Sequence, residues 1–514
     1  MFVGELKPYQ VDSVGKMVER KKMLVAFEMG TGKTVMTIAA IEELGPKKTL
    51  VIALSSLKYQ WSKEIAKFSD SSSVVIDGTP KQRAGQYEKA RGNVDYVVVN
   101  YEQVVNDFDT IKSLKFDAVV IDEATAIKGF RSKRSRKVKE LTRNIPIRFA
   151  LTGTPVENGR PEELYSIMQF VDSQVLGRFD IFDQAFIVRN HFGGVQRYRN
   201  LPIFHEKMKE VSVRKTQKDP DVAPYLPDEI HRDPLLVKFD PRSSNLYRLI
   251  SDELSQELLE AQQLLGSGFS LLAHYGMEHQ PGSQADMLRG SIMSKITALR
   301  MLCDHPALLQ KSAAQYGSEE GGSAYAYSLF QRGLLDDVKA TRKLDALAMY
   351  VKDHLDTDPD AKVVVFTSYV TMVDVIASLL GGERYTGQMN AKQKETAKEA
   401  FLTDPEVRVL VSSDAGGYGV DLPNANLLVN YDLPWSAGLS VQRNGRIKRA
   451  SSRWPSITIQ DILVDKSIET RQWDMLQQKN AVSGAILDGK GINSKGGVDM
   501  TVGSLLGFLQ QERP

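Results

Sequence analysis

Short apolar runs alternate with amphipathic helical patterns along the first half of the chain. Such alternation is typical of a parallel sheet wrapped by helices. The runs predict strands at Met23–Phe27, Thr49–Ala53, Tyr96–Val99, Ala118–Ile121 and Arg148–Leu151. In sheets of this kind ligands gather at the carboxyl ends of the strands. Polar residues that directly follow these runs are therefore the first candidates for a functional site.

A second alternation of the same kind begins at Lys362. It predicts strands at Val363–Phe366, Val407–Val411, Leu427–Asn430 and Ile457–Leu463. The pattern as a whole therefore predicts an α/β protein with two lobes, each built on its own parallel sheet.

Helical patterns and turn signals lie between and after the two alternations. Helices are predicted at Glu162–Asp172, Phe179–Val188, Ser244–Leu265 and Ser291–Leu309. The segment Asp219–Pro234 holds four prolines and is predicted to be the lobe boundary. The interval Gln315–Tyr327, rich in Gly, Ser and Tyr, predicts a mobile loop. After a glycine-rich stretch, Gly489–Gly497, the last apolar positions predict a docked terminal helix: Val502, Leu505, Leu506 and Leu509.

These signals predict four parts. The first is an N-terminal lobe at residues 1–225, with a helical insertion at about 160–215. A helical insertion and linker of the second lobe follow at 226–340, then the C-terminal lobe at 341–488 and a tail at 489–514.

Composition narrows the class of protein. The 514 residues are 42% hydrophobic and 25% charged, which describes an ordinary globular protein. The formal net charge is only +2, so a nucleic-acid site would depend on local clusters of Lys and Arg. A single cysteine, Cys303, excludes a disulfide framework and a cysteine-based zinc site. With no signal-peptide profile and no apolar run of membrane-spanning length, we expect a cytoplasmic protein that binds no membrane.

A glycine-rich stretch between the first predicted strand and a helical pattern is typical of a P-loop. It consists of Glu28, Met29, Gly30, Thr31, Gly32, Lys33 and Thr34. In such a loop backbone N–H groups face phosphate oxygens, Lys33 reaches the β- and γ-phosphates, and Thr34 offers its hydroxyl to Mg²⁺. The full pattern has glycine five residues before Gly32, where this chain has Phe27. By itself the stretch therefore also fits a glycine-rich turn.

Two further motifs follow predicted strands of the first half. Asp122 and Glu123 come directly after Ala118–Ile121. In a P-loop enzyme Asp122 would hold the Mg²⁺ water shell, and Glu123 would orient or deprotonate the attacking water. An isolated Asp-Glu pair also fits a solvated turn. The next strand ends in Leu151–Pro155, which alone reads equally well as an ordinary turn.

The segment between these motifs is strongly basic. It has one acid, Glu140, against eight basic residues: Lys128, Arg131, Lys133, Arg134, Arg136, Lys137, Lys139 and Arg143. This density predicts salt-sensitive contact with nucleic-acid phosphates. The alternative is a solvated helix face.

The second half has no P-loop, and its candidate chemistry lies in two glycine- and arginine-bearing stretches, Ser413–Leu422 and Gln442–Arg449. Arg446 and Arg449 are three residues apart, a spacing that places both on one face of a helix. From a second lobe such guanidinium groups can reach a transferring phosphoryl group as arginine fingers when the lobes close. The alternatives are a solvated helix and phosphate contacts to DNA.

Together and in this order, these residues resemble the two-lobed RecA-like motors of helicase superfamily 2, and within it the Swi/Snf-type ATPases. The resemblance covers nearly the whole chain. It rests on Leu6–Gln10, Glu28–Thr34 (motif I), Leu54–Trp61 (Ia), Val98–Glu102 (Ib), Asp122–Thr125 with Ile127 and Lys128 (II), Leu151–Asn158 (III), Leu299–Pro306, Val364–Ser368 (IV), Ser413–Leu422 (V) and Gln442–Arg449 (VI).

The resemblance implies roles that residue spacing alone does not. Gln10 would bind the adenine edge, and Gly417 and Asp421 would join the nucleotide site. Nucleic-acid contacts would come from Ser55, Tyr101, Lys128, Arg131, Lys133, Thr367 and Ser413. Cys303 and His305 would be structural. Two positions depart from the family, which usually has His where Thr125 stands and often has His in place of Lys448. Thr125 puts the coupling of hydrolysis to motif III in question.

The resemblance implies a monomeric, DNA-dependent ATPase that uses ATP and Mg²⁺ to translocate along double-stranded DNA and to remodel protein–DNA or branched DNA structures. The sequence carries none of the accessory modules often joined to such motors, and on that basis we expect a bacterial or phage setting. Two alternatives stay open. One is a strand-separating DNA or RNA helicase of the same superfamily. The other, kept open by Thr125, is a nucleotide-gated DNA-binding protein with little hydrolysis.

Overall fold

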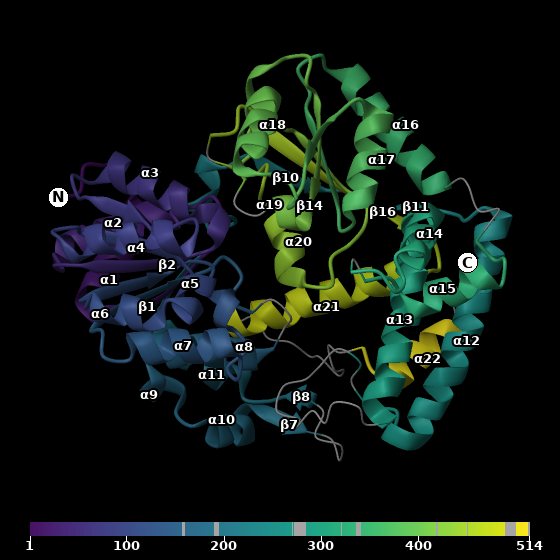
Figure 1. Ribbon diagram of the computed structural model, residues 1–514, viewed down its shortest axis with the longest axis horizontal. Helices are drawn as coiled ribbons and strands as arrows, with labels where there is room; N and C mark the ends of the chain where they lie inside the picture. Colours follow the sequence, from purple (N-terminus) through teal and green to yellow (C-terminus); the bar gives the residue numbers. More distant parts are fainter. Residues whose placement is uncertain are drawn as a thin grey trace.

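The computed structural model describes residues 1–156, 160–189, 195–269, 271, 284–319, 321–335, 341–417, 420–449, 451–488 and 500–511. Two α/β lobes lie beside each other, and a helical region flanks the second (Figure 1). Three predicted motif portions lie outside the described residues, namely Glu157 and Asn158, Tyr418 and Gly419, and the stretch Gly489–Gly497. Within the described residues no helix is both long enough and apolar enough to cross a bilayer.

The first lobe is built on a parallel sheet in the order β3-β4-β2-β5-β6-β1-β9. Its strands are β1 (Lys22–Phe27), β2 (Thr49–Ala53), β3 (Ser73–Val75), β4 (Tyr96–Asn100), β5 (Ala118–Ile121), β6 (Ile147–Leu151) and β9 (Ser212–Lys215). The five strands predicted for this half are confirmed to within one residue at either end. β2 and β5 are buried at every position, and each fully buried Val or Ile contributes about 1.5–3 kcal/mol.

Helices cover both faces of this sheet (Figure 1). They are α1 (Pro8–Arg20), α2 (Lys33–Leu44), α3 (Lys58–Phe68), α4 (Pro80–Arg91), α5 (Tyr101–Asn106), α6 (Phe108–Ser113) and α7 (Lys133–Thr142), with short 3₁₀ turns η1 (Ser55–Leu57) and η2 (Ala124–Ile127). Each parallel crossover therefore returns through a helix, and the polar loops that carry the motifs are left at the carboxyl ends of the strands.

An insertion follows β6. It comprises α8 (Pro161–Val171), α9 (Ser173–Leu176), α10 (Phe179–Phe186), β7 (Ile187–Arg189), β8 (Val195–Tyr198) and α11 (Leu201–Lys209). The helix predicted over Phe179–Val188 is too long. It ends at Phe186 because the β-branched Ile187 and Val188 pair with β8 in an antiparallel ribbon.

The second sheet has the strand order β10-β16-β15-β12-β14-β13, with β11 also paired to β16. Its strands are β10 (Asp228–His231), β11 (Leu235–Val237), β12 (Val363–Thr367), β13 (Glu383–Tyr385), β14 (Val409–Ser413), β15 (Leu427–Asn430) and β16 (Ser456–Val464). The strand predicted at Val407–Val411 starts two residues later. Helices α16 (Arg342–Thr357), α17 (Val370–Leu380), α18 (Ala391–Thr403), α19 (Asp414–Gly417) and α20 (Ala437–Asn444) complete the lobe.

The turn-rich segment after β9 contains more regular structure than predicted. It holds the 3₁₀ turn η3 (Ala223–Tyr225) and the strand β10, which joins the second sheet by parallel pairing with β16. Pro227 and Pro234 stand on either side of β10 rather than inside it. Proline is tolerated next to an edge strand because no ladder hydrogen bond is lost there.

The helical region consists of α12 (Pro241–Leu265), α13 (Gln284–Asp304), α14 (Pro306–Ala314) and α15 (Ala324–Gln331), joined by α21 (Ile468–Asp488) and α22 (Val502–Gln511). Two predictions are corrected. The single helix over Ser291–Leu309 is divided at His305, because Pro306 starts a new helix. The loop over Gln315–Tyr327 is partly helical from Ala324.

The predicted terminal helix is confirmed. α22 docks on α12, with Val502, Leu505, Leu506 and Leu509 buried in the core of the helical region. α21 extends from that region toward the first lobe, where it packs on α11 (Figure 1). Leu487, near its end, contacts the core of the first lobe.

Candidate functional site

The glycine-rich loop joins β1 to α2, as predicted. β1 ends at Phe27 and α2 begins at Lys33. Gly30 and Gly32 have φ values of 75° and 86°, a region in which a side chain would be strained. The Lys33 Nζ donates to the carbonyl oxygens of Phe27 (2.9 Å) and Glu28 (3.2 Å). Burial lowers the pKa of Lys33, and nearby Glu123 and Asp122 oppose that shift.

Side chains from distant segments hold this loop in place. The Gln10 Nε2 donates to the Thr31 carbonyl at 3.0 Å, so Gln10 is attached to the loop itself. Gln217, which the sequence did not single out, holds the other side. Its backbone N–H donates to the Glu28 carboxylate at 2.8 Å, and its side chain donates to the Met29 carbonyl at 2.8 Å. The loop is therefore fixed at its beginning and at its apex.

The acidic pair follows β5 and faces the loop. The Asp122 Oδ2 accepts from the Trp61 indole N–H at 2.8 Å, and its Oδ1 accepts from the Glu123 backbone N–H at 2.9 Å. Burial raises the pKa of Asp122, while Trp61 and Lys33 favour its charged form. Glu123 has a left-handed backbone with φ 49°, an uncommon conformation for a residue with a side chain. This constraint fixes the direction in which the Glu123 side chain leaves the strand.

The donor set at this point fits Mg²⁺. Thr34 is the second residue of α2 and is half-buried, and Asp122 is buried beside Lys33. A hydroxyl and a carboxylate are hard oxygen ligands, and Mg²⁺ is commonly held by one or two carboxylates together with substrate phosphates.

Residues of the second lobe meet the loop directly. A Cβ placed on Gly30 would lie 3.1 Å from the Lys448 carbonyl oxygen and 3.3 Å from an Arg449 guanidinium nitrogen. The positive charge of Arg449 also contributes to the lowered pKa of Lys33. The Arg449 Nε donates to Asp421 Oδ1 at 2.7 Å. Lys33 of the first lobe and Arg449 of the second therefore lie beside the same glycine-rich loop.

The prediction that Arg446 and Arg449 share a helix face is wrong. α20 ends at Asn444, and both arginines lie in the turn and loop after Gly445. Arg446 is buried, and its carbonyl accepts from the Leu422 backbone N–H at 3.0 Å. The groups of this loop that lie next to Gly30 are the Arg449 side chain and the Lys448 carbonyl oxygen. Gly445 itself packs against the Met29 side chain.

A cavity of about 1910 Å³ opens between the lobes next to this site. Three of the predicted nucleic-acid contacts line it, namely Ser55, Lys128 and Arg131. Further basic side chains line both walls: Lys63 and Arg134 from the first lobe, and Lys394 and Lys398 from the second. Sequence reasoning missed those on α3 and α18 because neither helix carries a basic run.

In the folded protein the residues of the basic segment lie in different environments. Lys133 is exposed at the start of α7 but lies outside the cavity wall. Lys139 turns inward and donates to the Ser166 hydroxyl at 2.8 Å, and burial lowers its pKa to about 8. The segment is thus neither a uniform DNA-binding face nor a uniformly solvated one.

Three other predicted nucleic-acid contacts are buried. The buried Tyr101 hydroxyl donates to the Asp122 carbonyl at 2.6 Å, so Tyr101 holds the backbone of the acidic pair in place. Thr367 donates to the Asp432 carboxylate at 2.6 Å, and Ser413 accepts from the Gly416 backbone N–H at 3.2 Å. None of the three belongs to the described wall of the cavity.

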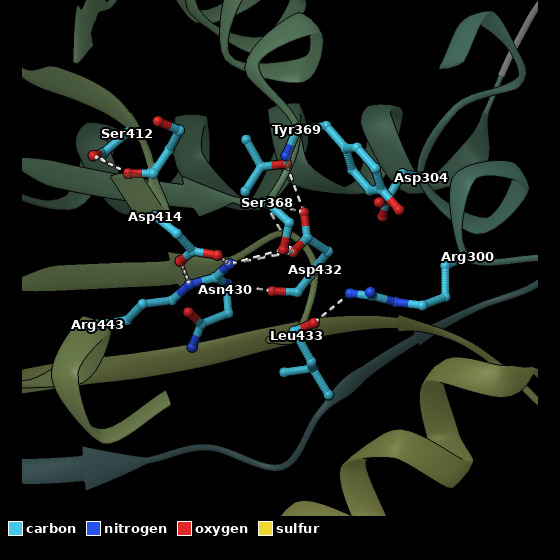
Figure 2. Close-up of polar contacts among 12 residues, drawn as sticks. Arg300, Asp304, Ser368, Tyr369, Ser412, Asp414, Asn430, Asp432, Leu433 and Arg443 are labelled. Atoms are coloured by element: carbon cyan, nitrogen blue, oxygen red, sulfur yellow. Dashed lines mark hydrogen bonds and ion pairs between the residues drawn. The ribbon is translucent and has the colours of Figure 1, made fainter. Parts of the chain in front are cut away.

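Arg443 organises the motifs of the second lobe (Figure 2). Its Nε and a terminal nitrogen donate to the two oxygens of Asp414 at 2.6 and 2.9 Å. The other terminal nitrogen donates to the Asp432 carbonyl at 2.5 Å, and Asp432 in turn accepts from Ser368. Burial alone would lower the pKa of Arg443, but Asp414 and Asp432 raise it above its usual range. One guanidinium therefore joins motifs IV, V and VI.

We expect Arg443→Met to lower the free energy of unfolding of the second lobe by about 3–5 kcal/mol, because it leaves the buried Asp432 and the partly buried Asp414 without their guanidinium partner. The urea transition measured by circular dichroism checks this. Arg384→Met is the matched control, since Arg384 pairs with Asp374 while both side chains are about half exposed, at 55% and 48%. That control should cost less than about 1 kcal/mol. Equal transitions for the two variants would contradict the assignment.

Comparison with known proteins finds two family models along the chain. The SNF2-related domain matches residues 9–308, and the helicase conserved C-terminal domain matches residues 343–451. Among curated relatives, the putative ATP-dependent helicase/translocase YwqA of Bacillus subtilis is 25% identical over 505 residues, covering 95% of this chain and 49% of that protein. The human DNA repair and recombination protein RAD54B is 25% identical over 537 residues, covering 95% of this chain and 55% of that protein. The chain thus spans about half the length of these relatives.

Two solved structures show similar chains. The Pyrococcus furiosus Hef helicase domain has a TM-score of 0.51 and 16% identity, with 91% of this chain and 97% of that chain covered, a likeness of fold. The Sulfolobus solfataricus SWI2/SNF2 ATPase core in complex with dsDNA has a TM-score of 0.41 and 22% identity, with 94% of each chain covered.

Proposed function

The chain belongs to the family of SNF2-related domains, and from that premise we propose that it is a DNA-dependent ATPase that translocates along double-stranded DNA without separating its strands. The observation that carries the proposal is the approach of Arg449, from the second lobe, to Gly30 in the phosphate loop of the first. A site divided between two lobes turns the binding and hydrolysis of ATP into a change in their arrangement.

Each residue of the site has a distinct task in this proposal. Lys33 exchanges the carbonyl oxygens of Phe27 and Glu28 for phosphate oxygens. Asp122 and Thr34 would hold Mg²⁺, which would supply positive charge against the phosphate groups of ATP. Glu123 orients the attacking water and accepts its proton.

The nucleotide's other contacts come from both lobes. Gln10, which bonds to the Thr31 carbonyl, would bind the adenine edge. Gly417 and Asp421 are proposed to join the nucleotide site from the second lobe. Arg449, which bonds to Asp421, would leave it to stabilise charge on the transferring phosphoryl group. Arg446 is proposed as the second guanidinium of the same loop.

The cavity between the lobes is the proposed path of the DNA. Lys63, Lys128 and Arg131 would grip phosphates from the first lobe, and Lys394 and Lys398 from the second. Contacts of this kind neutralise phosphates without reading bases, so binding would be salt-sensitive and show little sequence preference. Closure and reopening of the two lobes would then move the phosphate contacts of one lobe relative to those of the other. Such a movement would allow the protein to remodel protein–DNA complexes or branched DNA structures.

The proposal predicts which nucleic acid stimulates ATP turnover. ATPase rate is measured without nucleic acid and with single-stranded DNA, duplex DNA, branched DNA and RNA. Duplex DNA should raise the rate by at least about tenfold, equivalent to about 1.4 kcal/mol of barrier. Stimulation by single strands or RNA alone would contradict the proposal.

Translocation itself is tested by two assays run together. The protein should displace the third strand of a DNA triplex in an ATP-dependent way and should leave a plain duplex unseparated. Strand separation without triplex displacement would favour the helicase alternative. ATP-dependent DNA binding with neither displacement nor turnover would favour the nucleotide-gated binding protein.

A further inference from the structure

The connection between the lobes touches the site at both of its ends. After β9 the chain places Gln217 on the phosphate loop, where it bonds to Glu28 and Met29. It then enters the second lobe as β10, and the Glu229 carboxylate on that strand lies 2.9 Å from the Lys448 Nζ. One short piece of chain therefore contacts both the loop that would hold phosphate and the loop that carries Arg449.

The ion pair between Glu229 and Lys448 is largely shielded from solvent. The Lys448 side chain is 6% exposed and the Glu229 side chain 18%. Glu229 also accepts from the His231 ring nitrogen at 2.5 Å, on its other carboxylate oxygen. Burial would raise the pKa of Glu229, but His231 and Lys448 lower it to about 2, so the carboxylate is charged.

The peptide that this pair anchors is the one that meets the first lobe. The Lys448 carbonyl oxygen and the Arg449 guanidinium are the two groups nearest to a Cβ built on Gly30. α20 has already ended at Asn444, so no helix fixes the position of residues 448 and 449. The side chain of Lys448 supplies an attachment, and β10 holds that attachment to the sheet through its register with β16, Glu229 opposite Ile457.

We propose that Glu229 is a positioning residue for ATP hydrolysis, which holds Lys448 and thereby sets Arg449 against the phosphate loop. The inference rests on the proposed function, because it assigns the arrangement to the same ATP site. Loss of either partner leaves the other charge buried and frees the loop, so that Arg449 samples positions away from the phosphate loop. Nucleotide binding by Lys33 and Gln10 is unaffected, because both residues lie in the first lobe.

Two single variants and one double variant test the pair. We expect Glu229→Gln and Lys448→Met each to lower kcat by about 10²-fold, the scale of an ångström-level misplacement, while KM for ATP stays within about threefold. The double variant E229K/K448E should recover most of the lost kcat, since it restores opposite charges. Lys448→Arg keeps the charge and should stay within about threefold of the unmutated protein. If the double variant does not fold, Lys448→Arg is compared with Lys448→Met instead. Retained kcat in the first and lost kcat in the second support the inference, and equal losses overturn it.

His231→Gln is the matched control, because His231 also bonds to Glu229 but its side chain is 59% exposed, whereas that of Lys448 is 6% exposed. It should leave kcat within about twofold, the range of an exposed pair. A loss as large as that of Glu229→Gln would overturn the inference, as would unchanged kcat in both single variants.

Hydrogen–deuterium exchange gives a readout that does not depend on hydrolysis. In the protein without nucleotide, Lys448→Met should reduce protection of residues 446–449 by about tenfold, and His231→Gln should not. Unchanged protection in Lys448→Met would overturn the inference. Absence of ATP turnover by the unmutated protein would instead overturn the proposed function, and the exchange result would then decide the inference alone.

Discussion

Lys33→Ala should abolish ATP turnover and leave the protein folded. The Lys33 Nζ donates to the carbonyl oxygens of Phe27 and Glu28, which a phosphate oxygen would replace. Alanine removes the positive charge that would neutralise the β- and γ-phosphates. A loss of at least about 10³-fold in kcat/KM is expected, the upper range for removing one preorganised donor from a transition state. The measurement is steady-state ATPase rate with saturating duplex DNA.

Lys48→Ala is a matched control for that variant. The Lys48 Nζ also donates to two carbonyl oxygens, those of Ala90 at 2.6 Å and Gly92 at 3.2 Å, but it lies far from the phosphate loop in the fold. It should retain turnover. If Lys33→Ala kept DNA-stimulated turnover with an unchanged circular dichroism spectrum, the assignment of the loop to phosphate binding would be wrong.

The central strands were predictable because each is a continuous apolar run. β2 and β5 are buried on both faces, and this leaves no alternation of polar and apolar positions to misread. The missed strands are edge strands. β3 is half-buried, and β9 and β10 carry charged residues, since an edge strand needs only one partner and little burial. Their existence depends on the neighbouring strand and could not be inferred locally.

The positions of the glycine-rich loop after β1 and of the acidic pair after β5 were predictable for a different reason. Their chemistry requires particular residues next to one another in the sequence, so the signal is local. The surroundings of the proposed nucleic-acid contacts could not be predicted in this way. Tyr101, Thr367 and Ser413 lie in segments that resemble contact motifs, yet their side chains point into the protein and support Asp122, Asp432 and Gly416. Resemblance to a family motif identifies a segment, but it does not determine which way the side chains of that segment point.

The ion pairs between residues far apart in the chain could not be predicted from the sequence either. Arg443 bonds to Asp414 and Asp432 within one lobe, and Lys448 bonds to Glu229 across 219 positions of the chain. Each pair needs the finished sheet to bring its members together. The helix predicted to carry Arg446 and Arg449 failed on a local feature, because Gly445 follows the end of α20 and the chain turns there.

Arg449→Ala should spare ATP binding yet slow hydrolysis by at least about 10³-fold, the scale of an arginine finger. Arg449 comes from the second lobe and is held by Asp421 in this structure, with a guanidinium nitrogen 3.3 Å from the Cβ position of Gly30. We propose that a movement of the lobes would bring it from there to a γ-phosphate bound by Lys33. Because the contact forms only as charge develops, its loss should appear in kcat rather than in the dissociation constant for ATP.

Two further variants decide whether Arg449 acts on phosphate or on DNA. Arg449→Lys keeps a positive charge but loses the planar fork, so most of the defect should remain if the guanidinium clamps the phosphoryl group. Arg453→Ala is the control, because Arg453 lies four residues further on and bonds to the Asp360 carbonyl at 2.8 Å at an exposed position. Single-turnover hydrolysis is measured beside DNA affinity at two salt concentrations. A defect under about tenfold in hydrolysis, with weaker and less salt-dependent DNA binding, would place Arg449 among the phosphate contacts to DNA instead.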